Sequence, residues 1–248
     1  MNKLQNVKSL CLAAALVLSG LCAQAQELEF SAYFNGVLPT SSFGQKVSVT
    51  QKIAFVDVFT PMNRETIATN AAAGLGFTGR AGYWFDMGFG EIMPYVEVSF
   101  LWNSLRSDVC KEYDAAGVKY PNYFNVPAFL GFKYRYDIND IFRPFAEVGV
   151  GYDFLFITRS AQHVYYNADG SEKETLWYRF TPSSALCWEA GIGTYLGRNV
   201  SVGLYYLGLG NHKIRYARNS RGRSDDNNAN ISSTRTLGDF AFRLGFHF

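Results

Sequence analysis

Charged side chains recur at alternate positions along several stretches of the chain, and these residues are the best suited to chemistry. Their neighbours of opposite parity are apolar or aromatic, so the charges would share one face of an extended segment. Isolated charges away from water are costly, and we therefore expect a hydrogen-bonded ionic network. Such a network acts as a polar plug, or alternatively as a gate or proton relay. Its predicted members are Arg80, Glu97, Lys133, Arg135, Arg143, Glu147, Asp153, Glu189 and Arg243.

Several glycines, together with Tyr95 and Phe145, occupy the same alternate positions as these charges and so share their face. They either make room for long side chains or leave a cavity for a small ligand, and both interpretations stay open. These glycines are Gly74, Gly76, Gly131, Gly149, Gly151, Gly191, Gly193 and Gly203.

Nucleophilic catalysis needs a nucleophile, a histidine base and an orienting acid within mutual reach. The chain has three histidines: His163 in an expected loop, and His212 and His247 at a surface or rim. Neither Ser201 nor Ser232 has a spacing that pairs it with a histidine. The sequence also lacks Walker, Rossmann and zinc-type motifs. We therefore predict no catalytic residue, no cofactor and no metal.

The first 25 residues have the three-part pattern of a secretory signal peptide. Lys3 and Lys8 precede an apolar stretch at 10–21, and Ala23-Gln24-Ala25 resembles a cleavage site. The apolar stretch is shorter than the roughly 18–20 residues of a membrane-spanning helix. We predict cleavage after residue 25 and one mature domain over 26–248.

Cleavage changes the charge of the 248-residue chain, whose formal net charge is +2. Two of its 23 basic residues lie in the signal peptide, so the remaining 21 balance the 21 acidic residues. This balance makes nucleic-acid binding improbable. An aromatic content of 17% excludes a disordered chain. Cleavage leaves two cysteines, Cys110 and Cys187. We expect two unpaired thiols, or a disulfide only if the loop that carries Cys110 folds inward.

Strict alternation of apolar and polar residues indicates about eight strands, several of them longer than the usual five or six residues of strands in soluble sheets. Roughly 9–11 residues of tilted strand cross a bilayer. The connections alternate between long and short, as in outer-membrane barrels. We predict an all-β fold, an eight-stranded antiparallel up-and-down transmembrane β-barrel. The alternating segments are 28–35, 72–85, 93–104, 123–136, 142–156, 181–196, 200–216 and 240–248.

Aromatic residues lie at the expected ends of these strands, where membrane interfaces would be. Examples are Tyr83, Tyr134 and Tyr136 at one end, and Trp102 and Phe154 at the other. The alternative is a secreted β-sandwich or lipocalin-like barrel, which seldom needs strands of this length.

One β-prone stretch does not fit the pattern. Residues 46–49 and 52–58 lie inside the first long connection, 39–71. We interpret them as an external extension of the first hairpin. The connections at 105–121 and 159–180 are predicted to be loops.

The alternating strands end in Phe246-His247-Phe248. With the signal peptide, this pattern resembles the small eight-stranded outer-membrane barrels of the OmpA/OmpX type. The resemblance implies location in the outer membrane of a Gram-negative-type bacterium. The terminal aromatics Phe248 and Phe246 resemble the signal read by the barrel-assembly machinery. The resemblance carries over no catalytic residue, and we expect a monomer.

Basic residues cluster near the top of the seventh strand and in the next connection. They are Lys213, Arg215, Arg218, Arg221 and Arg223. Phosphates of lipopolysaccharide would be natural partners, because arginine binds phosphate bidentately. The alternative is a loop that charge keeps soluble.

We therefore expect a non-enzymatic outer-membrane protein that reinforces the membrane or binds an extracellular ligand through its long loops. One alternative is a small-solute pore or carrier, which the glycines leave open. A second is a lipid A-modifying hydrolase.

Overall fold

The computed structural model describes residues 27–53, 56–59, 65–117, 119–139, 141–158, 160–166, 172–220 and 231–248. The predicted signal peptide lies outside these residues. Within the described residues, no helix combines the length and the apolar character needed to cross a membrane.

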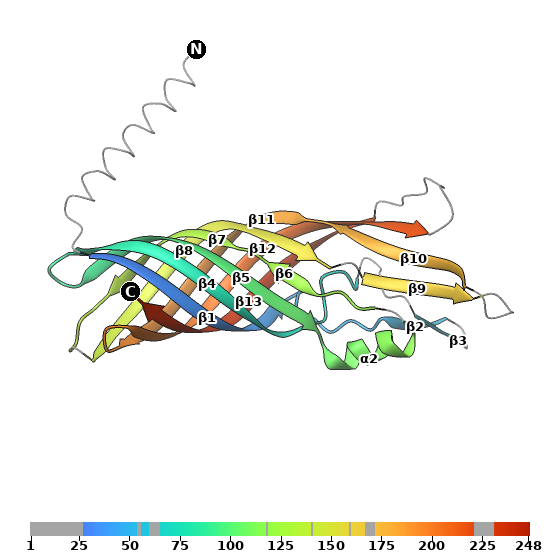
Figure 1. Cartoon of the computed structure of the whole chain (residues 1–248), viewed down its shortest axis with the longest axis horizontal. Helices are drawn as coiled ribbons and strands as arrows, with labels where there is room; N and C mark the ends of the chain where they lie inside the picture. Colours follow the sequence, from blue (N-terminus) through green and yellow to red (C-terminus); the bar gives the residue numbers. More distant parts are fainter. Residues whose placement is uncertain are drawn as a thin grey trace, which may run out of the picture.

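Eight antiparallel wall strands close into a barrel (Figure 1). The predicted eight-stranded fold is confirmed. The first strand, β1, pairs on one side with β4 and on the other with the last strand, β13, which closes the wall. The wall comprises β1 (Glu27–Ser41), β4 (Ala71–Asp86), β5 (Glu91–Leu105), β6 (Tyr123–Asn125) with β7 (Ala128–Arg135), β8 (Phe142–Ile157), β11 (Ser183–Leu196), β12 (Val200–Ser220) and β13 (Ile231–His247).

Side-chain parity turns the barrel's apolar face outward. Phe77, Phe100, Leu130 and Val150 are exposed. The charged residues of opposite parity on the same four strands are buried, namely Arg80, Glu97, Lys133 and Glu147. A soluble barrel would show the reverse arrangement, with charges in water and apolar residues inside. The exposed apolar band is the surface that a transmembrane barrel presents to lipid.

The fourth wall strand is not continuous, although 123–136 is predicted as one strand. It divides into β6 and β7 at Val126 and Pro127. Proline has no N–H to donate to a ladder. The backbone locally re-pairs instead, with Val126 N–H donating to Phe154 O and Ser99 N–H donating to Pro127 O.

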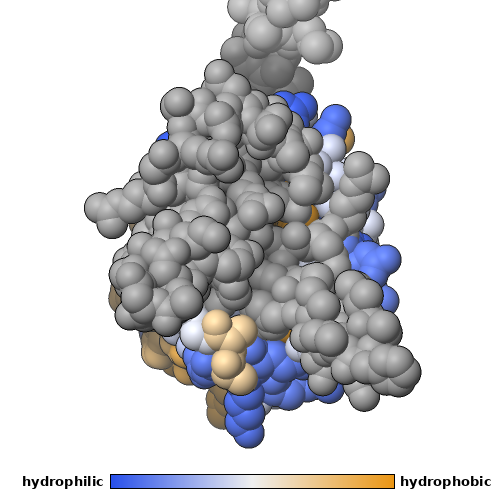
Figure 2. Space-filling view, turned by 90° about the vertical axis from the view of Figure 1, so that its right-hand side faces the viewer, coloured by the Kyte–Doolittle hydropathy of each residue, from blue (hydrophilic) through white to orange (hydrophobic). Residues whose placement is uncertain are grey.

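Additional elements gather at one end of the barrel, on the right in Figure 1. We call this the external end, because the long connections lie there, and the opposite end periplasmic. In the end-on view of Figure 2, many of the described residues in sight are hydrophilic. The elements are β2 (Thr50–Ile53), β3 (Val56–Phe59), α2 (Ser107–Ala115), β9 (Ser160–Tyr166) and β10 (Glu172–Thr181).

The connection 159–180, predicted as a loop, contains the β9–β10 hairpin. Both β10 and β11 pair with β12, at different heights but in the same register. Thr181 of β10 lies opposite Arg215, and Trp188 of β11 lies opposite Gly208. The loop prediction is wrong because β12 extends well beyond the membrane. Its upper edge would otherwise expose unpaired backbone groups, and β10 covers that edge.

The connection 105–121 is also not a simple loop, since α2 occupies its first half. The helix ends at Ala115 with Ala116 as its C-cap, and Gly117 follows with a φ of 66°, the left-handed conformation common just after a helix. The Gly117 N–H donates to Asp114 O at 3.0 Å.

The stretch predicted to extend the first hairpin forms a separate two-stranded sheet of β2 and β3. The β1–β4 pairing stops at Val37 and Gly74. Beyond it the chain turns inward, because the apolar side chains of Phe43 and Val49 are buried over the barrel mouth. Residues 54 and 55 lie outside the described part of the chain.

Candidate functional site

The centre of the barrel holds a cluster of three carboxylates and three cations. Strand pairing places Arg80 of β4 opposite Glu97 of β5, and Lys133 of β7 opposite Glu147 of β8. Glu189 of β11 and Arg243 of β13 project into the same part of the lumen and are hydrogen-bonded to each other. All six side chains are buried. We call these six residues the central ionic cluster.

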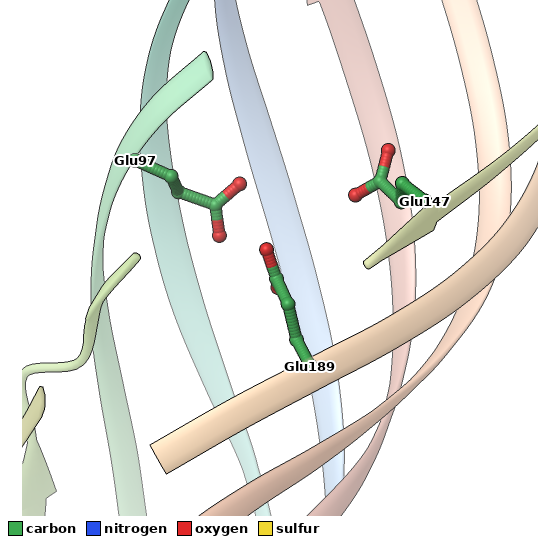
Figure 3. A group of neighbouring side chains, drawn as sticks. All are labelled: Glu97, Glu147 and Glu189. Atoms are coloured by element: carbon green, nitrogen blue, oxygen red, sulfur yellow. The ribbon is translucent and has the colours of Figure 1, made fainter. Parts of the chain in front are cut away.

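Arginine forks connect the carboxylates across the lumen. Arg80 Nε donates to Glu97 Oε2 at 2.8 Å, and its Nη1 donates to Glu147 Oε2 at 2.8 Å. Arg243 Nη2 lies 2.9 Å from Glu97 Oε1 and 3.0 Å from Glu189 Oε2. Figure 3 shows the three glutamates pointing toward one another from different strands. The formal charges of the cluster therefore balance, three acidic against three basic.

The three glutamates offer oxygens within 4.8 Å of one another, which is close enough to suggest a metal site. The guanidinium of Arg80, however, bonds Glu97 and Glu147, and that of Arg243 bonds Glu189. These bonds already satisfy the carboxylates with charge-assisted donors. The arrangement is that of a buried ion-pair cluster.

Aromatic rings fill the space around the cluster. The Arg80 guanidinium lies 3.9 Å from the centre of the Tyr95 ring, and Tyr95 OH donates to Glu189 Oε1 at 2.7 Å. A Cβ at Gly131 would lie 2.4 Å from Tyr95, and one at Gly191 would lie 2.3 Å from Tyr205. At these two positions the inward glycines make room for aromatic rings, which is the first of the two interpretations left open by the sequence.

The other predicted network members lie apart from the cluster. Arg135 pairs with Glu91 toward the periplasmic end. Arg143 is half-buried there, and its Nη2 donates to Gly197 O at 3.0 Å. The sequence therefore predicts inward-facing charges but not their division into groups at different depths.

A second polar group, absent from the sequence prediction, closes the periplasmic end. Glu29 Oε1 lies 2.8 Å from His247 Nδ1, and His247 Nε2 lies 2.7 Å from Ser201 Oγ. Glu29 also accepts hydrogen bonds from Trp84 Nε1–H and Ser31 Oγ–H, each at 2.8 Å. The inference that Ser201 has no histidine partner is wrong.

Strand register explains this error. Ser201 faces Gly245 on β13, two residues before His247, and Ser31 faces His247 from β1. Glycine leaves the space in which Ser201 and the imidazole meet, since a Cβ at Gly245 would lie 2.5 Å from Ser201 Oγ. Barrel closure brings β1, β12 and β13 together, and spacing along the chain does not reveal it.

A third polar group lies toward the external end, where Asp153 pairs with His212. His212 Nε2 lies 3.1 Å from Asp153 Oδ2, and both residues are fully buried. The expectation of a surface or rim histidine is wrong, because a bulge at Gly208–Gly210 shifts the β12–β13 register. Tyr205 and Leu207 point inward before the bulge, and His212 points inward after it.

Above these polar layers, an apolar cap covers the external mouth. Phe43, Ile67, Val109, Tyr113 and Tyr123 are all at most 2% exposed and belong to one apolar core. The Phe43 and Tyr123 rings pack edge to face at 5.2 Å. The cap therefore joins the first connection and α2 to the barrel wall.

Ionisable groups on α2 lie outside the membrane-spanning strands. Lys46 Nζ lies 2.6 Å from Asp108 Oδ2. This hydrogen bond and the positive charge lower the pKa of the exposed Asp108 carboxyl to about 2. Burial raises the pKa of the Cys110 thiol above its usual value. Cys110 and Cys187 are free thiols, as expected.

The basic residues proposed to contact lipopolysaccharide are described only in part. Lys213 and Arg215 are exposed on the outer face of β12. Arg218 belongs to β12, but its side chain is outside the described part of the structure, as are Arg221 and Arg223. The terminal aromatics Phe246 and Phe248 point outward at the periplasmic end, 45% and 78% exposed.

The chain matches a known family. Residues 45–207, about two thirds of the chain, match the model of the autotransporter β-domain. The matched segment begins after β1 and ends within β12. No curated protein matches the chain.

Solved structures with a similar fold include three bacterial surface or outer-membrane proteins. Neisserial surface protein A is 11% identical and covers 89% of this chain and 95% of its own, with a TM-score of 0.38. OprG from Pseudomonas aeruginosa is 12% identical and covers 91% and 97%, with a TM-score of 0.44. AlkL in lipid bilayers is 13% identical and covers 90% and 92%, with a TM-score of 0.45.

Proposed function

The chain belongs to the autotransporter β-domain family, and from this premise we propose that it is a closed outer-membrane barrel that displays a folded external surface for interaction. In this proposal the barrel neither conducts solutes nor catalyses a reaction. The family and the outward apolar band place it in the outer membrane, among its lipids and lipopolysaccharide.

The observation that carries the proposal is the filled lumen. Arg80 alone reaches from β4 to carboxylates on β5 and β8, and Arg243 reaches from β13 to Glu189 on β11. The apolar cap adds a second barrier above this cluster. An eight-stranded barrel has an interior just wide enough for its own side chains.

The external elements support the second half of the proposal. Long wall strands continue past the membrane in β12, and the β9–β10 hairpin pairs with that extension. Loops this long usually carry structure or function of their own. The β2–β3 sheet and α2 lie at the same end (Figure 1).

Planar-bilayer recording tests whether the barrel is closed. We expect the purified full-length mature barrel to give no steady single-channel steps, because both the cluster and the cap block its lumen. An open porin reconstituted under the same conditions serves as the positive control. Reproducible opening events would contradict the proposal and favour the small-solute pore.

One observation favours a hydrolase as the second candidate. His247 is hydrogen-bonded to Ser201 on one side and to Glu29 on the other, which is the order of nucleophile, base and acid in a catalytic triad. Two facts argue against it. Ser201 is 2% exposed, and Glu29 is engaged by Trp84 and Ser31 as well as by His247. On this basis we propose a structural role for the three residues.

Fluorophosphonate labelling distinguishes the two candidates. We expect no covalent adduct on the folded barrel by intact mass spectrometry, because the buried Ser201 hydroxyl is inaccessible to the reagent. A serine hydrolase labelled in the same detergent is the control. An adduct that disappears in Ser201→Ala would establish a reactive serine and overturn the non-enzymatic proposal.

A further inference from the structure

The wall of the barrel has an interruption between β11 and β12. Their ladder stops at Trp188 and Gly208, and pairing with β12 resumes only at Thr181 and Arg215. Two causes coincide in this interval: Pro182 has no N–H to donate, and the bulge before Gly210 redirects β12. The interruption is therefore built into the sequence.

A cleft of about 600 Å³ opens on the outer surface at this interruption. Its lower part is apolar, formed by Leu186, Trp188 and Tyr206, and its upper part is polar, formed by Asn211 and Thr236. Leu186 is 70% exposed and Trp188 is 49% exposed. An apolar floor beneath polar groups fits an amphipathic molecule.

Aromatic packing places the cleft at the external interface of the membrane. The Trp188 and Tyr206 rings lie 5.3 Å apart, and Tyr206 and Phe240 lie 5.1 Å apart. Nine residues connect Trp188 to Leu196 at the periplasmic end of β11. Roughly that length of tilted strand crosses a bilayer, so these rings belong to the external aromatic girdle.

Cations lie above the cleft on the same outer face. Lys213 and Arg215 follow Asn211 at alternate, exposed positions of β12. Arg179 of the adjacent β10 is also exposed and faces Ala217 of β12. We call the outer surface of β10, β12 and β13 above the cleft the basic patch. At its described outward positions, the polar side chains carry a hydroxyl group, an amide group or a positive charge. The patch therefore has the charge that attracts phosphate.

We propose that this cleft binds the phosphorylated glucosamine headgroup of a lipid A-type glycolipid in the outer leaflet. Lys213, Arg215 and Arg179 contact the phosphates. Asn211 and Thr236 lie at the level of the sugar, and the acyl chains lie against Leu186 and Trp188. The inference is independent of the closed lumen, because the cleft lies on the outside of the wall.

Native mass spectrometry of the detergent-solubilised barrel tests the cleft, with bisphosphorylated lipid A as the probe. We expect wild type to retain the probe, and Lys213→Glu with Arg215→Glu to lose at least tenfold in bound fraction. The matched control is Lys111→Glu with Lys119→Glu, the same charge change at exposed external positions on and after α2. The control should bind like wild type.

Binding of other ligands to the wild-type barrel distinguishes lipid A from other anions without the use of a variant. Dephosphorylated lipid A and phosphatidylglycerol should bind wild type weakly, and millimolar inorganic phosphate should not displace the glycolipid. Equal retention of phosphatidylglycerol would show general attraction of anionic lipid and overturn the proposal, as would equal losses in both double variants. Heat-dependent gel mobility verifies that each variant is folded.

Discussion

Replacing Arg80 with methionine should destabilise the folded barrel by about 3–5 kcal/mol. Arg80 is fully buried and bonds two carboxylates, those of Glu97 and Glu147. Its removal leaves the central ionic cluster with three carboxylates and two cations. An uncompensated buried charge is far more costly than a lost exposed ion pair, which contributes about 0–1 kcal/mol.

The measurement is equilibrium unfolding of the refolded barrel in lipid vesicles by denaturant. Arg143→Met is the matched control, because Arg143 is half-buried at the periplasmic end and bonds a backbone carbonyl. Arg143→Met should destabilise the barrel by about 1.5 kcal/mol, the low end for a hydrogen bond from a charged group, because Arg143 is partly exposed. Combining Arg80→Met with Glu147→Gln should recover part of the loss by removing one unpaired charge. Equal destabilisation by the two arginine variants would contradict the structural importance of the cluster.

The sequence allowed the barrel, and the direction of its charges, to be predicted for a local reason. In a strand, parity alone decides whether a side chain faces lipid or lumen. Arg80, Glu97 and Glu147 could therefore be assigned inward from their neighbours. Parity says nothing about depth along the barrel, which depends on strand register and tilt. For this reason parity alone groups Arg135 and Asp153 with the central ionic cluster, although they lie toward opposite ends of the barrel.

Contacts between distant segments account for most of what could not be predicted. Ser201 and His247 are 46 residues apart and meet only because β12 pairs with β13. The apolar cap likewise depends on how the connections fold back over the barrel mouth. The β9–β10 hairpin needed the extension of β12 as its partner. None of these contacts has a periodic signal in its own segment.

The inward turn of His212 did have a local signal, the glycines of Gly208-Leu209-Gly210. Glycine inside a strand often marks a bulge, and a bulge reverses parity for the residues that follow. If the alternation of inward and outward residues continued unbroken through this tripeptide, His212 would point outward. If the bulge shifts the alternation by one residue, His212 points inward. The same bulge opens the cleft between β11 and β12.

Gly210→Ala should therefore have the second large effect, about 3–5 kcal/mol of lost stability. Gly210 has a φ of 94°, which a residue with a Cβ rarely adopts. A Cβ there would also lie 2.1 Å from the backbone oxygen of Leu186, which cannot move as a side chain can. The strand can relieve both strains only by losing the bulge, which would expel His212 from its contact with Asp153.

Gly79→Ala is the informative comparison, because a Cβ at Gly79 on β4 meets no atom within 4 Å. It should leave stability unchanged or raise it by about 0.5–1 kcal/mol, since alanine loses less entropy than glycine in a strand. Denaturant unfolding in vesicles gives both values, and the His212 imidazole signals in NMR spectra report whether its environment changes. If Gly210→Ala unfolded like Gly79→Ala with unchanged imidazole signals, the bulge would not be what turns His212 inward. A loss confined to Gly210→Ala would make one glycine responsible for the parity of the external half of β12, and so for both the buried Asp153–His212 pair and the cleft outside it.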